Sequence, residues 1–273
     1  MVKPICDTLK ELACFDLVEV ARPRCRKFET KSFRARAAAE EFNRHADREY
    51  VRLHQDHIPV IDEDGERVDW ESLIKEAVEL NYDSVMIDDS RLPLEENIKI
   101  TRAMVKIGHS QGISVEAELG AVMGHEKDPL PPYEELFRSG KGFTNVGEAE
   151  RFVEETSVDW LSIAIGNIHG AISGMAKDKK KIEAKLNIEH LERISERVKI
   201  PLVLHGGSEI RLEYLLEAIK NGITKINIRT VIRQVYEKDL KNGLESAQEA
   251  VSRVVRSLIK GYQIQGNIER LRR

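Results

Sequence analysis

Histidine side chains follow three short apolar runs of this sequence, at the point where each run ends. These residues are His57, His169 and His205. A catalytic zinc site commonly uses three protein ligands, such as neutral imidazoles, and leaves one coordination position open for substrate. A lone histidine after a strand is more often a structural hydrogen-bonding group. The coincidence of three therefore predicts a metal site, provided that the fold brings their runs together.

A further histidine, His54, lies three residues before His57. In an extended strand, this spacing points the two side chains to opposite faces. We expect His57, which is nearer the end of the run, to reach the metal. We expect His54 to be packed or to support a ligand.

A long connection is predicted from Ala121 to Thr144, and it carries His125 and Glu126. Long connections in compact domains are usually functional or mobile. This one could deliver an acid–base pair to a bound substrate.

Small and polar residues cluster after the last two apolar runs. They are Gly206, Gly207 and Ser208 in one segment and Asn227 and Thr230 in the other. Small residues let backbone N–H groups approach an anion closely, which favours a phosphate site. The alternative is that the two glycines only make a tight turn.

The apolar runs themselves are β-branched, about five to seven residues long, and separated by segments with helical periodicity. This pattern is typical of parallel strands covered by helices. The six runs begin at Tyr50, Asp83, Ser114, Asp159, Ile200 and Thr224. The helical segments are expected at 70–80, 94–111, 146–156, 188–198 and 211–221, with Gly112 and Gly222 as stop signals after two of them.

Two more strands are expected near the N-terminus, at 2–5 and 16–21, with a short helix at 7–12 between them. Eight strand–helix units would close a (β/α)8 TIM barrel, in which the C-terminal ends of the strands share one pocket. We therefore predict an α/β protein with a single barrel domain, residues 1–273, in which residues 236–273 form a C-terminal helical extension. The alternative is an open doubly wound sheet, which would usually carry a Gly-rich turn after its first strand.

Composition excludes several classes of protein. The chain has 273 residues, of which 41% are hydrophobic and 33% charged, so it can bury a large core. Its net charge of −4 argues against nucleic-acid or anionic-membrane binding by bulk charge. The longest apolar runs are too short for a membrane span. Three cysteines without metal-finger spacing indicate reduced thiols in a cytoplasmic protein.

Six segments, in this order, resemble the class II, zinc-dependent aldolases that act on fructose- or tagatose-bisphosphate. They are LHQDH, SVMIDDSRLPLEENI, VEAELGAVMGHE, AIGNIHG, IPLVLHGGS and KINIRT. The resemblance extends from about Tyr50 to Tyr236. It implies a lyase of glycolysis or carbohydrate metabolism that binds a small phosphorylated sugar and forms a homo-oligomer, a dimer or a tetramer.

The resemblance also implies a role for individual residues. His57, His169 and His205 match the zinc ligands, and Asp88 and Glu118 match carboxylates near the metal that can hold a second divalent cation. Asp56 matches the acid–base group for the C4 hydroxyl, and Glu126 matches the carboxylate that exchanges a proton of the ketone phosphate. The matches around the phosphate and a monovalent cation are Gly170, Gly206, Ser208, Asn227 and Thr230. Gly207 and Arg229 are expected to lie beside them at the same phosphate site.

The alternative aldolase chemistry uses a lysine that forms a Schiff base in an apolar pocket. Lys225 is the one lysine near a core strand, and we expect it to stand at the start of that strand and therefore at the wrong face.

Two positions depart from the family pattern where phosphate is expected. Glu209 replaces a glycine, and Arg229 stands where the family usually has Asp or Ala. An unpaired carboxylate would oppose a phosphate, so we expect Arg229 to reach Glu209 or the phosphate. The alternative is that both side chains point to solvent.

The sequence therefore predicts a zinc-dependent aldolase that reversibly cleaves a ketose bisphosphate, fructose 1,6-bisphosphate above others, to dihydroxyacetone phosphate and an aldehyde. Two alternatives remain. One is a metal-dependent hydrolase on the same barrel, and the other is a non-catalytic aldolase-like binding protein.

Overall fold

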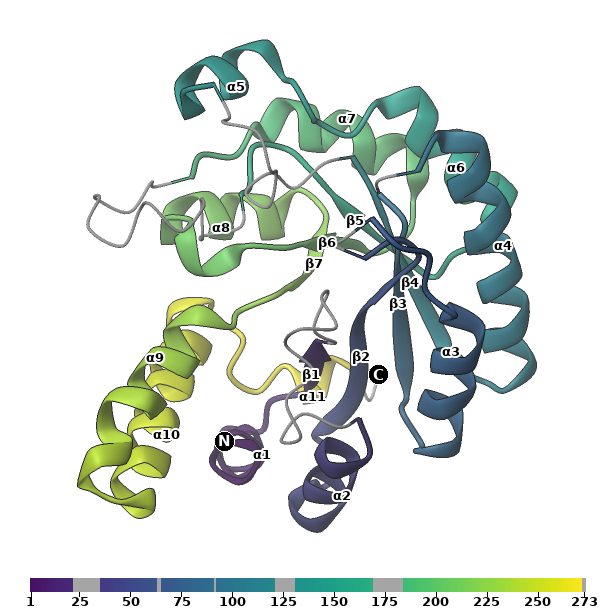
Figure 1. Ribbon diagram of the computed structural model, residues 1–273. Helices are drawn as coiled ribbons and strands as arrows, with labels where there is room; N and C mark the ends of the chain where they lie inside the picture. The colour runs from purple at the N-terminus through teal and green to yellow at the C-terminus, as the bar shows by residue number, and fades with distance from the viewer. Residues whose placement is uncertain (22–34, 63–64, 91, 121–130, 169–183, 272–273) are drawn as a thin grey trace. The chain divides into compact units, whose positions relative to one another are not determined.

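The computed structural model describes residues 1–21, 35–62, 65–90, 92–120, 131–168 and 184–271 (Figure 1). The chain divides into two units. The first contains residues 1–88, 106–115 and 231–273, and the second contains residues 89–105 and 116–230.

Three parallel strands form the sheet of the first unit. They are β1 (Asp16–Ala21), β2 (Val51–Pro59) and β3 (Ser84–Asp88), and neighbours in the sheet are also neighbours in the chain. Helix α3 (Trp70–Glu79) packs on β2. Helices α1 (Val2–Glu11), α2 (Ala35–His45), α10 (Leu244–Gly261) and α11 (Ile268–Leu271) also belong to this unit, as does α9 (Thr230–Asp239) except for its first residue.

The N-terminal residues form a helix, so the strand predicted at residues 2–5 is wrong. Apolar side chains at Val2, Ile5, Cys6 and Leu9 follow a helical spacing, and the interior positions Cys6 and Leu9 are buried. Pro4 lies in the first turn, where its missing N–H leaves no intrahelical hydrogen bond unmade. Helix α1 packs against α2 and α10.

The second unit continues the strand–helix alternation. Strands β4 (Ser114–Leu119), β5 (Trp160–Ile163), β6 (Leu202–Leu204) and β7 (Ile223–Ile226) pair in parallel in chain order. The helices are α5 (Tyr133–Ser139), α6 (Val146–Thr156), α7 (Ile188–Val198) and α8 (Leu212–Lys220). Helix α4 (Leu94–Ser110) and strand β4 each contribute residues to both units.

The predicted alternation is confirmed for six strands and for the strand at 16–21, with ends that shift by a few residues. Gly112 and Gly222 end α4 and α8 with φ of 70° and 113°. The protein is thus an α/β protein with seven parallel strands in the described residues. The connection predicted from Ala121 to Thr144 is corrected in part, because it contains α5.

The C-terminal region is helical, as its amphipathic pattern predicts. In α10 the residues that share one face, Ala247, Ala250, Val251, Val255 and Ile259, are buried. None of the described helices combines the length and the apolar character that a membrane span requires.

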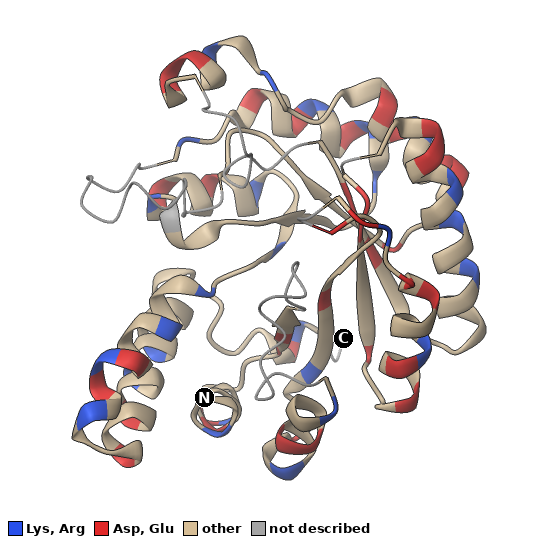
Figure 2. Cartoon of the chain, in the orientation of Figure 1, with Lys and Arg blue, Asp and Glu red and all other residues tan. Residues whose placement is uncertain are grey.

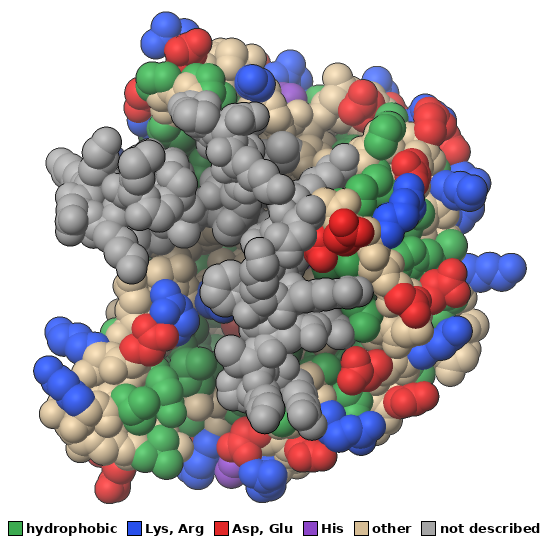
Figure 3. Space-filling model, viewed as in Figure 1, with side chains coloured by type: hydrophobic (Ala, Val, Ile, Leu, Met, Phe, Trp, Pro, Cys, Tyr) green, Lys and Arg blue, Asp and Glu red, His purple; other side chains and the backbone are tan. Residues whose placement is uncertain are grey.

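The helices carry charges of both signs. In Figure 2, both signs lie along α6, whereas in α4 the acidic residues are in the first turn and the basic ones follow. The space-filling view in Figure 3 likewise shows acidic and basic side chains interspersed with hydrophobic ones. In the second unit, Arg151 bridges Glu95 and Glu155.

Candidate active site

Strand β2 has an irregularity at the residues for which chemistry is predicted. Its register against β3 shifts between Gln55 and Ile58, and His57 has a φ of +47°, in the left-handed region. A non-glycine residue in this region is held there at a cost of about 1–3 kcal/mol, and such residues cluster at functional sites. Because a bulge changes the direction of the strand's side chains, simple alternation does not apply to Asp56 and His57.

His57 is buried and paired with a carboxylate of the next strand. Its Nδ1 lies 3.0 Å from Oδ2 of Asp88, the last residue of β3, and its Nε2 lies 3.7 Å from Oδ2 of Asp56. The exposed fractions of these three residues are between 6% and 9%. An ionised carboxylate only accepts hydrogen bonds, so Nδ1 is the nitrogen that donates to Asp88.

His54 lies away from solvent and contacts Ser84. The two are joined at 2.8 Å between Nδ1 and Oγ, and His54 is 0% exposed. The prediction that His54 is packed is confirmed.

The second unit holds a matching pair around His205, which directly follows β6. Nε2 of His205 lies 3.0 Å from Oε1 of Glu116, in β4, and both side chains are almost fully buried. Oε2 of Glu118 lies 3.7 Å from Nδ1 of His205, which is too long for a hydrogen bond. Glu118 also lies 3.5 Å from the hydroxyl of Ser162.

Lys225 is the third of the four residues of β7, and its side chain is turned towards this cluster. Its Nζ lies 2.8 Å from Oε2 of Glu116 and 2.8 Å from Oδ1 of Asn227. The expectation that Lys225 occupies the start of its strand and the wrong face is therefore wrong.

Glu116 and Lys225 are the residues of this cluster that the sequence analysis missed. Alternation along a strand places Glu116 on the same face as Glu118, and Lys225 on the same face as Asn227. Because Glu118 and Asn227 were both predicted site residues, this period of two was the signal that could have found their neighbours.

The two glycines after β6 have a packing role. Gly206 has a φ of +75°, and a Cβ added there would lie 2.3 Å from the carbonyl oxygen of Ile168. A Cβ on Gly207 would lie 2.5 Å from Ile226 and 2.7 Å from Ile228. Glycine is thus required for close packing at both positions, whether or not the segment also binds an anion.

The remaining predicted residues fall into two groups. Arg229 is exposed, and Ser208 and Thr230 are half-buried. Glu126, His169 and Gly170 lie outside the described residues, as does the side chain of Glu209.

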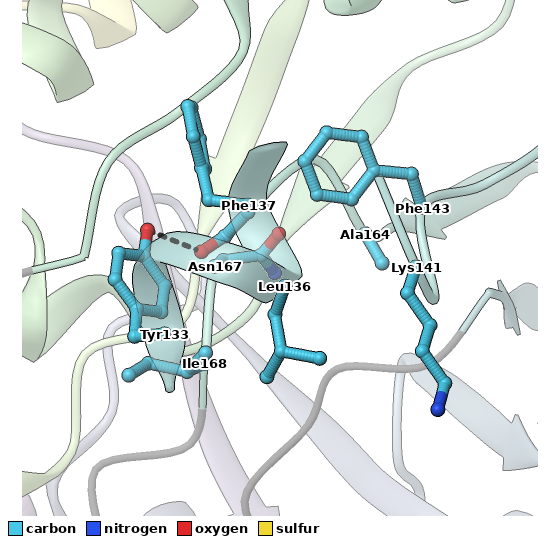
Figure 4. Close-up of a pocket in the computed structure, with 9 residues that line it drawn as sticks. Tyr133, Leu136, Phe137, Lys141, Phe143, Ala164, Asn167 and Ile168 are labelled. Atoms are coloured by element: carbon cyan, nitrogen blue, oxygen red, sulfur yellow. Dashed lines mark hydrogen bonds between the residues drawn. The ribbon is translucent and has the colours of Figure 1, made fainter. Parts of the chain in front are cut away.

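Helix α5 is joined to the segment after β5 by hydrogen bonds of a tyrosine hydroxyl. The hydroxyl of Tyr133 donates to the carbonyl oxygen of Gly166 at 3.0 Å (Figure 4) and accepts from the backbone N–H of Lys185. The Phe137 and Phe143 rings pack edge to face beside it. The enclosed space is about 20 Å³, room for one water, so this pocket does not hold a sugar phosphate.

The donor groups of both clusters fit zinc. Each candidate ligand is an imidazole that has one ring nitrogen hydrogen-bonded to a carboxylate. The partner is Asp88 for His57 and Glu116 for His205. Metal-binding histidines almost always have such a partner, which fixes the ring and its tautomer. The other nitrogen of each ring is of the type that zinc prefers.

The fold and these buried histidine–carboxylate pairs are consistent with an α/β aldolase. Residues 15–267 match the family described as Fructose-bisphosphate aldolase class-II. The chain belongs to this family.

Individual relatives agree with this assignment. Fructose-bisphosphate aldolase from Staphylococcus epidermidis is 35% identical over 201 residues, and the match covers 69% of this chain and 65% of the relative. The enzyme of the same name from Geobacillus stearothermophilus is 38% identical over 167 residues, which cover 61% of this chain and 53% of the relative. The matched region thus spans less than two thirds of the length of these relatives.

Solved structures match over more of the chain. The YdjI aldolase from Escherichia coli K12 is 27% identical, with a TM-score of 0.75 over 98% of this chain and 89% of that one. A putative fructose-1,6-bisphosphate aldolase from Coccidioides immitis is 26% identical, with a TM-score of 0.73 over the same shares.

Proposed function

We propose that this protein is a class II aldolase that reversibly cleaves a ketose bisphosphate, with fructose 1,6-bisphosphate as the first substrate to test. The products are dihydroxyacetone phosphate and an aldehyde. The observation that carries the proposal is that two buried imidazoles are each hydrogen-bonded to a carboxylate, in a chain that belongs to this family.

The proposed metal ligands are His57, His169 and His205. Asp88 and Glu118 are proposed as nearby carboxylates that can hold a second divalent cation. When bound, zinc supplies a Lewis acid that stabilises the negative charge left on the ketone fragment by cleavage. A site of this kind suits an aldolase because that charge develops on oxygen atoms that a metal can reach.

The protein's own groups move the protons in this proposal. Asp56 takes the proton of the C4 hydroxyl, a role supported by its buried carboxylate, 3.7 Å from Nε2 of His57. Glu126 exchanges the proton on the carbon of the ketone phosphate. The phosphate and a monovalent cation are held by residues of three segments: Gly170, Gly206, Gly207, Ser208, Asn227, Arg229 and Thr230.

The experiment that tests this function measures zinc content together with turnover of fructose 1,6-bisphosphate. We expect about one zinc per chain, cleavage that stops on chelation, and loss of zinc in His169→Ala and His205→Ala. Full zinc occupancy in both variants would overturn the ligand assignment. A hydrolase would release no dihydroxyacetone phosphate and would not need Glu126, and a binding protein would show no turnover.

Three further features belong to this proposal. The first is the closed (β/α)8 barrel in a single domain, supported by the likeness to the solved aldolases over 98% of the chain. The second is a homo-oligomer, a dimer or a tetramer, which sedimentation would measure. The third is a cytoplasmic location, supported by the buried free thiols of Cys6 and Cys14.

A further inference from the structure

A half-buried lysine, Lys225, is linked to His205 through Glu116. The side chain of Lys225 is 12% exposed, and its ammonium lies 2.8 Å from Oε2 of Glu116. Glu116 is 0% exposed and also faces His205 through its other oxygen, at 3.0 Å. A carboxylate in such a place needs a cationic partner, because an unpaired buried charge is strongly destabilising.

The two oxygens of Glu116 therefore have different partners. Lys225 donates a hydrogen bond to Oε2, and Oε1 is the oxygen that faces Nε2 of His205. Because the carboxylate only accepts, this geometry requires an N–H at Nε2. In the neutral imidazole the lone pair is then at Nδ1.

The amide of Asn227 contacts the same ring nitrogen and does not reverse this assignment. Its Nδ2 lies 3.1 Å from Nε2 of His205, and its Oδ1 accepts from Lys225. Nε2 cannot accept from an amide while it donates to a carboxylate. A charge-assisted hydrogen bond is roughly twice as strong as a neutral one, so the bond to Glu116 decides the tautomer.

We propose that Lys225 is a positioning residue, which acts through Glu116 to hold His205 in the Nε2–H tautomer and to present Nδ1 for metal binding. The proposal rests on the proposed function in one respect, that His205 is a zinc ligand. It assigns Lys225 a role other than the formation of a Schiff base.

The test reads the tautomer directly, by ¹⁵N NMR of histidine-labelled, zinc-free protein, with the His205 signals assigned from His205→Ala. We expect the Nε2–H form in the wild type and in Lys225→Arg, which preserves a cation. In the double variant Lys225→Met/Glu116→Gln we expect both tautomers, because an amide can turn either its oxygen or its nitrogen to the ring. Zinc affinity, measured against a chromophoric chelator, should fall about 10–100-fold in the double variant.

The double variant removes both charges, so it leaves no unpaired buried carboxylate even if Lys225→Met alone does not fold. Lys220→Met is the matched control, because that lysine is 71% exposed, and it should change neither the tautomer nor the affinity. An Nδ1–H tautomer in the wild type would overturn the proposal. So would a folded double variant with unchanged tautomer and zinc affinity. Zinc retained by His205→Ala would instead overturn the ligand assignment, independently of the tautomer.

Discussion

Nδ1 of His57 lies 3.0 Å from Oδ2 of Asp88, and the two residues belong to neighbouring parallel strands. His57 reaches this position from a bulge and with a left-handed backbone, so its ring is directed by local geometry as well as by its partner. Nε2, the other ring nitrogen, lies on the side of Asp56 and is the ligand atom that the proposed metal site would use.

The first prediction concerns this pair. Asp88→Asn should lower zinc affinity by about 10–100-fold, because the ring of His57 loses the charged partner that orients it. The measurement is competition with a chromophoric chelator, and Asp7→Asn, at an exposed position of α1, is the control. Unchanged affinity would show that Asp88 does not orient the ligand. A loss well beyond this range would place Asp88 among the ligands themselves.

The second prediction separates two carboxylates by the step each serves. Asp56→Ala should reduce cleavage by about 10²–10⁴-fold, the usual effect of removing a positioned acid–base group. It should still exchange the proton of dihydroxyacetone phosphate, whereas Glu126→Ala should lose that exchange. Tritium exchange and cleavage assays on the same preparations measure the two steps. Equal loss of both steps in Asp56→Ala with its zinc retained would contradict the division.

Most strands could be predicted because continuous β-branched runs leave a clear pattern, and His57 and His205 were proposed as metal ligands from their places at the ends of such runs. The direction in which the side chain of His57 points could not be predicted, because a single left-handed residue at a bulge leaves no periodic signal in the sequence. The second half of α1 lies in the helix predicted at 7–12, but its first half was predicted as a strand, because four residues from Val2 to Ile5 are too few to distinguish the two periods. The contact between Glu116 and Lys225 joins positions 109 residues apart, which local spacing cannot reveal.

The third prediction concerns the thiols. Burial raises the pKa of Cys6 from its ordinary 9.0 to about 11, and it also raises the pKa of Cys14. A raised pKa means that the neutral thiol is the favoured form, so at pH 8 about one Cys6 in a thousand is a reactive thiolate. In a Cys25→Ser variant, we expect no reaction with Ellman's reagent at pH 8 until guanidinium unfolds the protein. Rapid reaction in the native state would show that burial does not protect these thiols.

The fourth prediction tests whether Arg229 and Glu209 compensate each other. Arg229 is exposed, so its guanidinium is available to a phosphate or a carboxylate. Arg229→Ala should raise KM for a phosphorylated substrate at least several-fold, and addition of Glu209→Gly should recover part of the loss. Steady-state kinetics of the single and double variants decide the matter. Wild-type kinetics in both single variants would mean that the phosphate is bound without either residue.

The last prediction uses the close approach of Gly206 to Ile168. Gly206→Ala should lower the free energy of unfolding by roughly 2–5 kcal/mol, because the new Cβ adds overpacking against a carbonyl oxygen to left-handed strain. Gly112→Ala is the matched control. Gly112 also has a positive φ, 70°, but no atom lies within 4 Å of the added Cβ, so strain alone should cost about 1–2 kcal/mol. Urea denaturation measures both, and zinc affinity should fall only in Gly206→Ala, because Ile168 directly precedes His169 and Gly206 directly follows His205. Equal loss of stability in the two variants, with zinc affinity unchanged, would mean that the segment after β6 tolerates a side chain and that its glycines serve only the turn.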